Sequence, residues 1–208
     1  MTAKTRLLAS DLTTPGLLDP AAIPTLTFPT GITDPSAREA RLAHDVYVQV
    51  VDVENLSRSR WEQVEDLEAI ERGEQTRGRE VIRLPVGGGG GVGDEQETPP
   101  QPAAQQEAGG GGASKNATHR LVLQDCKGQK VFAIELTRIP KIAIGTLNIG
   151  EKILLRKGTI VARGTILLEP NTCHILGGKV DAWQKAWLEG RLARLKEAVR
   201  TGQAGVAD

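Results

Sequence analysis

The chain has 208 residues, and its 26 lysines and arginines balance its 26 aspartates and glutamates, so that the formal net charge is zero. This balance excludes a histone-like basic protein and a strongly acidic one. Aromatic residues make up 3% of the chain while glycine occurs 24 times. Such a mixture predicts an ordered part beside a disordered part instead of one large core.

The first element in chain order is a short helix expected over residues 5–12, which ends before Pro15-Gly16. Four prolines, at positions 20, 24, 29 and 35, then predict an extended or turning path. The β-branched run 46–53 follows, and it predicts a well-buried strand.

A second helix is predicted soon after this strand. Ser59 followed by Glu62 matches a capping box, and Trp61, Val64 and Leu67 recur at near-helical spacing. Because Trp61 has little nearby core to enter, we predict that it anchors a partner. The carboxylates at positions 62, 65, 66, 68 and 71 leave two alternatives open, a solvated acidic face or one that contacts a partner.

A glycine- and proline-rich segment begins after Pro85. Residues 86–117 are predicted to be disordered, because this composition cannot bury enough apolar surface to offset the entropy of ordering the chain.

Short strands with regular turn signals fill the next zone. They are expected over residues 120–125, 131–136, 152–157, 159–163, 165–169 and 173–176. With strand 46–53 they fit an OB-type barrel, in which a connection of about 65 residues, 54–118, separates the first two strands. Connections that long are usually functional or disordered.

The last predicted element is a helix over residues 180–200, with Trp183 and Trp187 on one apolar stripe that we expect to pack against the barrel. The alternative is that these two tryptophans anchor a partner. The predicted fold is therefore mainly β, an OB-fold barrel with a long insertion and a C-terminal α-helix. Its parts are a lead-in at 1–43 with a short helical remnant, the OB-fold domain at 44–200 with the insertion 54–118, and a tail at 201–208.

No residues with recognisable catalytic or metal-binding spacing are found. Cys126 and Cys173 form no CxxC pair and have no metal-ligand spacing to the three histidines, so we expect free thiols and no metal or cofactor. There is no serine or cysteine nucleophile motif, which predicts a protein that is not an enzyme. No stretch approaches the roughly 18 apolar residues of a membrane span, and no signal peptide is recognised.

Charge is distributed unevenly along the sequence. Residues 119–179 hold ten lysines and arginines against four acidic residues, while residues 54–118 hold seven against twelve. A basic OB barrel often binds single-stranded nucleic acid on exposed aromatic residues. Here the zone's one aromatic, Phe132, alternates onto the face of Ile134 and Leu136 and is predicted to lie in the core. We therefore favour protein binding with weak accessory DNA contact, and a stand-alone single-stranded-DNA-binding OB-fold protein is the alternative.

Several strings carry a family resemblance. They are Gly150-Glu151-Lys152-Ile153-Leu154-Leu155, the segments 163–171 and 175–181, Ile134-Glu135-Leu136 with Ile139-Pro140, and upstream Leu7-Leu8-Ala9-Ser10-Asp11-Leu12 and Val51-Asp52-Val53. Trp61-Glu62-Gln63-Val64 and Arg77-Gly78-Arg79 are similar to the fungal branch. Together they resemble the RecQ-mediated genome instability protein 1 family over residues 5–84 and 119–198.

The resemblance implies a non-catalytic nuclear scaffold. In that family the OB domain binds topoisomerase III, a type IA topoisomerase, and the pair joins a Bloom-type RecQ helicase to dissolve double Holliday junctions. It implies that the connection 54–118 enters the DNA gate of the topoisomerase. The candidate partner-binding residues are Lys152, Trp61, Val64, Leu67 and Ile70. The family usually begins with a small helical bundle, of which we expect this sequence to contain the last helix.

Overall fold

The computed structural model describes residues 2–73 and 117–204. Within these ranges the strands are β1 (Ala40–Arg41), β2 (Val46–Asn55), β3 (His119–Asp125), β4 (Lys130–Glu135), β5 (Lys152–Leu155), β6 (Ile160–Ala162), β7 (Thr165–Leu168) and β8 (Cys173–Gly177). The helices are α1 (Ala3–Ala9), α2 (Ile23–Leu26), α3 (Arg60–Glu71), α4 (Asp181–Glu189) and α5 (Arg191–Ala204).

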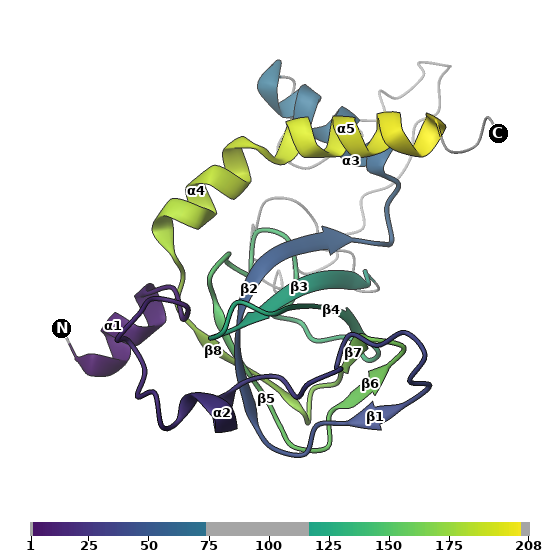
Figure 1. Ribbon diagram of the computed structural model, residues 1–208. Coiled ribbons are helices and arrows are strands. Elements are labelled where there is room, and N and C mark those ends of the chain that lie inside the picture. Colours follow the sequence, from purple (N-terminus) through teal and green to yellow (C-terminus); the bar gives the residue numbers. More distant parts are fainter. Residues whose placement is uncertain (1, 74–116, 205–208) are drawn as a thin grey trace, which may run out of the picture.

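The strands form one curled sheet in the order β1-β6-β7-β4-β3-β2-β5-β8 (Figure 1). All neighbours are antiparallel except β4 and β7, which run parallel. The curl encloses the core because β-branched and aliphatic residues alternate along the central strands. Val48 and Val50 of β2 and Leu121 and Leu123 of β3 are completely buried there.

The predicted strands are confirmed to within a few residues at each end. The two-residue strand β1 was not predicted, since Ala40 and Arg41 show no strand pattern and are held by pairing with β6. The long connection is also confirmed: β2 ends at Asn55 and its antiparallel neighbour β3 begins at His119. Of the range 86–117, for which disorder was predicted, all residues except the buried Ala117 lie outside the described part of the chain.

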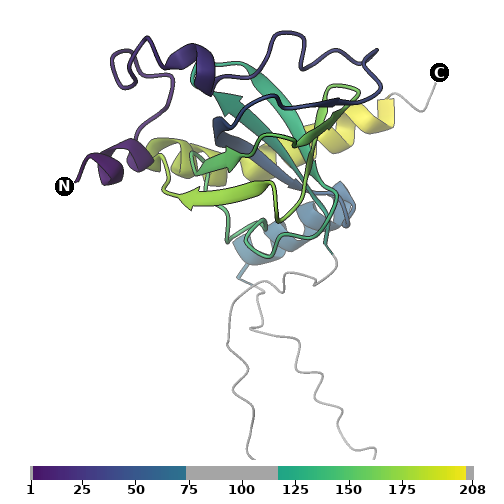
Figure 2. The same cartoon turned by 90° about the horizontal axis from the view of Figure 1, so that it is seen from below.

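The N-terminal segment packs at the end of the molecule opposite α3 (Figure 2). Helix α1 ends at Ala9, earlier than the predicted Leu12, because the next residues turn to bind the barrel: the Leu12 amide donates to Gln49 Oε1 at 3.0 Å. Pro24, expected in an extended path, lies instead in the first turn of α2. A proline is tolerated in a first helical turn because its missing N–H would have no partner there.

The prediction of one continuous helix over residues 180–200 is wrong. Two helices, α4 and α5, meet at Gly190 and change direction there (Figure 1). Glycine is a poor helix former, and Gly190 is the C-cap of α4, where its amide donates to the Ala186 carbonyl oxygen at 3.0 Å. Gly190 therefore marks the place where the helix is interrupted.

The predicted burial of Phe132 is also wrong, because the side chain is 50% exposed. The alternation along β4 was identified correctly, but Val131, Ala133 and Glu135 occupy the buried face. The alternation of apolar residues alone does not predict that the Glu135 carboxylate points into the core. Here His119 and Ile139 satisfy Glu135 with three hydrogen bonds, from the His119 amide, the His119 ring and the Ile139 amide.

Candidate protein-interaction site

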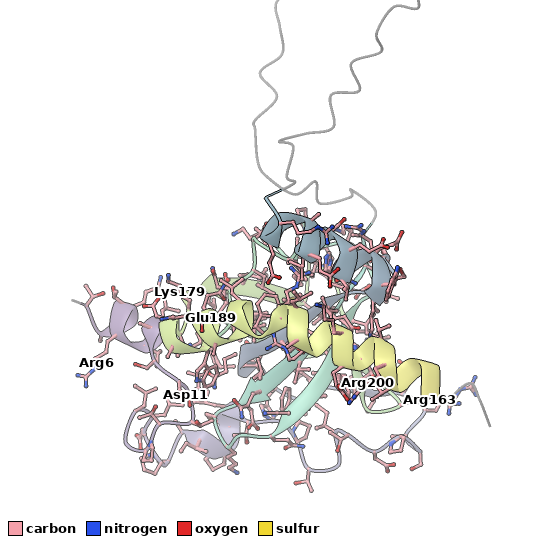
Figure 3. All side chains as sticks on the ribbon, turned by 90° about the horizontal axis from the view of Figure 1, so that it is seen from above. Arg6, Asp11, Arg163, Lys179, Glu189 and Arg200 are labelled. Carbon is pink, nitrogen blue, oxygen red and sulfur yellow. The ribbon has the colours of Figure 1, made fainter. Side chains whose placement is uncertain are left out.

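Helix α3, the first part of the long connection, is fixed in place by α5 (Figures 1 and 3). Its N-terminus has the predicted capping box, in which the Ser59 and Glu62 side chains each bind the other's backbone amide. Val64 is 4% exposed. Gln63 Nε2 donates to the carbonyl oxygens of Asn55 and Arg58, which ties α3 to the end of β2.

Polar contacts add to the packing between the two helices. Lys196 Nζ on α5 lies 2.7 Å from Glu68 Oε1 on α3, and this contact lowers the pKa of the Glu68 carboxyl. Arg191 Nη2 donates to Gln63 Oε1 at 3.4 Å. Exposed ion pairs contribute little to stability, so we attribute the attachment mainly to apolar packing, to which the buried Val64 contributes.

Trp61 projects from this helix pair, with 57% of its surface exposed. Its Nε1–H donates to Glu65 Oε1 at 2.8 Å, which fixes the side chain against its own helix. Beside it, α3 and α5 form a hollow of about 290 Å³. The lining residues are Trp61, Val64, Glu65, Glu68, Lys196, Val199 and Arg200.

The four partner-binding candidates of α3 differ in how far their side chains are exposed to solvent. Trp61 and the 46%-exposed Ile70 are available to another molecule, while Leu67 is half-buried and Val64 is buried. We define the arm as α3 and α5 together. The sequence predicted α3 but not its pairing with α5, since the two helices are separated by more than 100 residues.

Lys152 lies inside the molecule, with 3% of its surface exposed. Its Nζ donates to the carbonyl oxygens of Gly150 at 2.5 Å and Leu8 at 3.3 Å. Burial lowers the pKa of the Lys152 ammonium to about 8, against a smaller opposing effect of the Asp11 carboxylate. Lys152, a candidate partner-binding residue, is therefore not on the surface, and a partner could reach its ammonium only if the segment carrying Leu8 moved away.

Gln49 holds the same N-terminal segment. Although β2 is otherwise β-branched at this point, Gln49 is completely buried. Its Oε1 accepts the Leu12 amide, and its Nε2 donates to Asp11 Oδ1 at 2.6 Å and to Gln124 Oε1 at 3.1 Å. Sequence reasoning missed this role, although a glutamine inside a valine-rich strand was an available signal for a buried polar contact.

Among residues 2–73 and 117–204, no group of three or more histidine, cysteine or acidic side chains is placed to hold a metal ion. No helix in the described ranges is long and apolar enough to cross a membrane.

The curled sheet and the long connection between its first two barrel strands define a small protein of the OB type. Residues 28–191 match the family described as "RMI1, N-terminal OB-fold domain". The match covers more than half of the chain, and the chain therefore belongs to this family. The family resemblance and the OB fold expected from the sequence are both confirmed.

Two curated relatives carry the name RecQ-mediated genome instability protein 1. The one from Schizosaccharomyces pombe is 32% identical over 152 residues, which are 73% of this chain and 63% of the relative. The one from Saccharomyces cerevisiae is 33% identical over 98 residues, which are 43% of this chain and 39% of the relative. The chain thus spans less than two thirds of the length of either relative.

Proposed function

We propose that this chain is a non-catalytic, nuclear scaffold subunit of a RecQ helicase–topoisomerase III complex that promotes double Holliday junction dissolution and genome stability. Family membership supports the proposal, as do the relatives, whose names connect them to RecQ and to genome instability. The observation that carries it is the arm, which holds the exposed Trp61 at a fixed place on the OB domain.

The arm is suited to binding a protein. A large aromatic residue that is already held by its own helix loses little conformational entropy when a partner covers it. Tryptophan is among the residues that most often dominate binding energy at interfaces. Trp61 is therefore the proposed contact to the type IA topoisomerase, and Ile70, which is exposed near the C-terminal end of α3, is a second candidate.

Binding near the DNA gate of the topoisomerase would regulate strand passage only under one condition. The arm and the rest of the connection must contact the open and closed gate with different free energies, since a ligand with equal affinity for two states shifts neither. A fixed arm satisfies this condition more readily than a flexible one. Because it cannot adapt its shape, it makes different contacts with the open and the closed gate.

The test is affinity purification of the full chain from nuclear extract, with the bound proteins identified by mass spectrometry. A type IA topoisomerase and a RecQ helicase are expected among them. Trp61→Ala should reduce the recovered topoisomerase, whereas Leu188→Ala, which truncates an exposed residue of α4 outside the arm, should not. Recovery of neither enzyme with the parent chain would refute the proposal.

A further inference from the structure

A hollow of about 350 Å³ lies between the N-terminal segment and the barrel, where α1 and α2 lie beside β5 and β8 (Figure 1). We call it the leucine pocket, because its wall contains Leu7, Leu8, Leu12, Leu18, Leu26 and Leu176. Tyr47 of β2 also lines it, and because Tyr47 and Leu176 are each 40% exposed, the pocket is open to solvent on their side. Its volume falls in the range of small-molecule sites.

The buried ammonium of Lys152 is the charged group of this pocket. Among the described residues of the wall, Lys152 alone carries a charge at neutral pH. Cys126, in the β3–β4 turn, also lines the pocket. Burial and the neighbouring Asp125 carboxylate raise the pKa of the Cys126 thiol, which therefore stays uncharged. The pocket thus combines an aliphatic wall with a single positive charge.

This positive charge has no counter-ion in the fold. Within the described part of the chain, no carboxylate forms an ion pair with Lys152. Asp11 acts on the ammonium at longer range, but its carboxylate accepts hydrogen bonds from the amide and hydroxyl of Thr13 and from Gln49 Nε2. Burying a cation without an anion costs free energy, so a bound anion would find a site already arranged for it.

The hydrogen bonds of Lys152 indicate what kind of anion fits. An ammonium has three N–H donors, of which two bind the carbonyl oxygens of Leu8 and Gly150. One donor remains, and it suits one oxygen of a carboxylate. A phosphate group carries more charge and three acceptor oxygens, most of which would face leucine side chains without a partner.

We propose that the leucine pocket binds a medium-chain aliphatic carboxylate, with its carboxylate on Lys152 Nζ and its chain among the leucines. Octanoate has about ten non-hydrogen atoms, and benzene fits a cavity of roughly 150 Å³, so a pocket more than twice that size admits the whole molecule. This inference does not depend on the proposed topoisomerase partner, because the arm lies elsewhere on the molecule.

The experiment is a titration of the isotopically labelled full chain with sodium octanoate at pH 7, followed by heteronuclear NMR. The amide signals of Leu8 and Leu176 should shift together, with a dissociation constant below about 1 mM for a ligand of this size. The indole N–H signals of Trp61, Trp183 and Trp187, which line the two hollows beside α3 and α4, should stay in place.

Three further ligands separate the effects of charge and chain length. Octanol, which has the same chain but no charge, should bind at least 10-fold more weakly than octanoate, because a hydrogen bond to a charged group is lost. Octylammonium should bind more weakly still, since it would place a second cation beside Lys152. Hexanoate should bind roughly 10-fold more weakly than octanoate, because two fewer methylene groups are buried.

Two variants and their matched controls test the residues. Lys152→Met should weaken octanoate binding at least 10-fold, and Lys157→Met, at an exposed lysine of the β5–β6 turn, should not. Leu176→Glu should weaken it at least 5-fold by charge repulsion, whereas Leu188→Glu makes the same change at an exposed leucine of α4 without effect. Because Leu176 is partly exposed, that variant is expected to fold even if Lys152→Met does not.

The pH dependence distinguishes an ion pair from simple apolar binding. Between pH 7 and 9 the parent should lose octanoate affinity about 10-fold, because the protonated fraction of Lys152, whose pKa is about 8, falls by that factor. Octanol binding should not follow this profile.

Tighter binding of octanoate than of octanol, lost in Lys152→Met or Leu176→Glu but kept in the controls, supports the proposal. The proposal is overturned if octanoate causes no shifts up to about 10 mM, or if octanol binds as tightly as octanoate. It is also overturned if the indole signals of Trp183 and Trp187 move while those of Leu8 and Leu176 do not, because the ligand would then occupy the hollow beside α4.

Discussion

Trp187 Nε1 on α4 donates a hydrogen bond of 2.6 Å to Asp52 Oδ1 on β2. The guanidinium groups of Arg191 and Arg194 each lie 5.6 Å from the centroid of the same indole. A single side chain therefore connects the sheet, α4 and the first turn of α5. Through α5, this contact also determines where α3 and its exposed Trp61 are held.

Replacing Trp187 should loosen this connection. We expect Trp187→Ala to lower the free energy of unfolding by about 2–4 kcal/mol, somewhat less than a fully buried tryptophan because the side chain is half-buried. Trp187→Phe should cost about 1–2 kcal/mol, since it removes the bond to Asp52 but keeps the ring. Denaturant unfolding measures both, and a Trp187→Ala loss no larger than that of the exposed neighbour Leu188→Ala would contradict the assignment.

Val64 determines whether α3 stays attached to α5. Val64→Asp should destabilise the arm by about 2–4 kcal/mol, because a carboxylate would be buried without a partner. Amide hydrogen exchange should then accelerate in α3 and α5 while β2 and β3 stay protected, since the barrel core does not depend on this contact. Protection unchanged in α5 would show that the two helices do not support each other.

Trp61 provides the complementary test on the same helix. Trp61→Ala should leave the melting temperature unchanged, because the side chain is exposed, but should weaken topoisomerase III binding by about 2 kcal/mol if it is an interface anchor. Calorimetric titration of the topoisomerase with parent and variant measures the difference. A variant that binds like the parent would leave Trp61 without a role in the complex.

The sequence predicted the local features well because their signals are local. Alternation and turn glycines defined the strands, and Ser59 with Glu62 defined the start of α3. The errors arose where a distant contact decides the outcome. Phe132 faces solvent because the buried Glu135 is satisfied from other segments, and Lys152 is buried because the carbonyl group of Leu8, 144 positions away, reaches it.

The Lys152 ammonium predicts a specific pH dependence. Its pKa is about 8 in the folded chain and about 10.4 in an unfolded one. Between these values the unfolded chain binds more protons, so stability rises with pH. We expect the free energy of unfolding of the parent, relative to Lys152→Met, to increase on the order of 2–3 kcal/mol from pH 8 to 10.5.

The difference in the free energy of unfolding between the parent and Lys152→Met cancels the titration of all groups that the two proteins share. A difference that is constant over this range would mean that the ammonium is solvated in the folded chain. Lys152→Glu, in contrast, should unfold more readily at every pH above its carboxyl pKa, because a carboxylate would face the carbonyl oxygens of Leu8 and Gly150. Reduced partner binding by that variant would therefore reflect a displaced N-terminal segment.

A substitution at Gly178 tests whether the N-terminal segment that carries Leu8 is packed against the barrel. A Cβ at position 178 would lie 2.3 Å from the Leu8 carbonyl oxygen, while one at Gly177 would meet nothing within 4 Å. Both glycines have φ near +90°, so alanine incurs a similar backbone cost of about 1–2 kcal/mol at either position. We expect Gly178→Ala to cost roughly 2 kcal/mol more than Gly177→Ala, because Leu8 must move and release its contact with Lys152. Denaturant unfolding gives the two losses, and faster proteolysis near Leu8 in Gly178→Ala alone would locate the change. If the two alanine variants are equally stable and equally resistant, the N-terminal segment does not contribute to the fold through this contact.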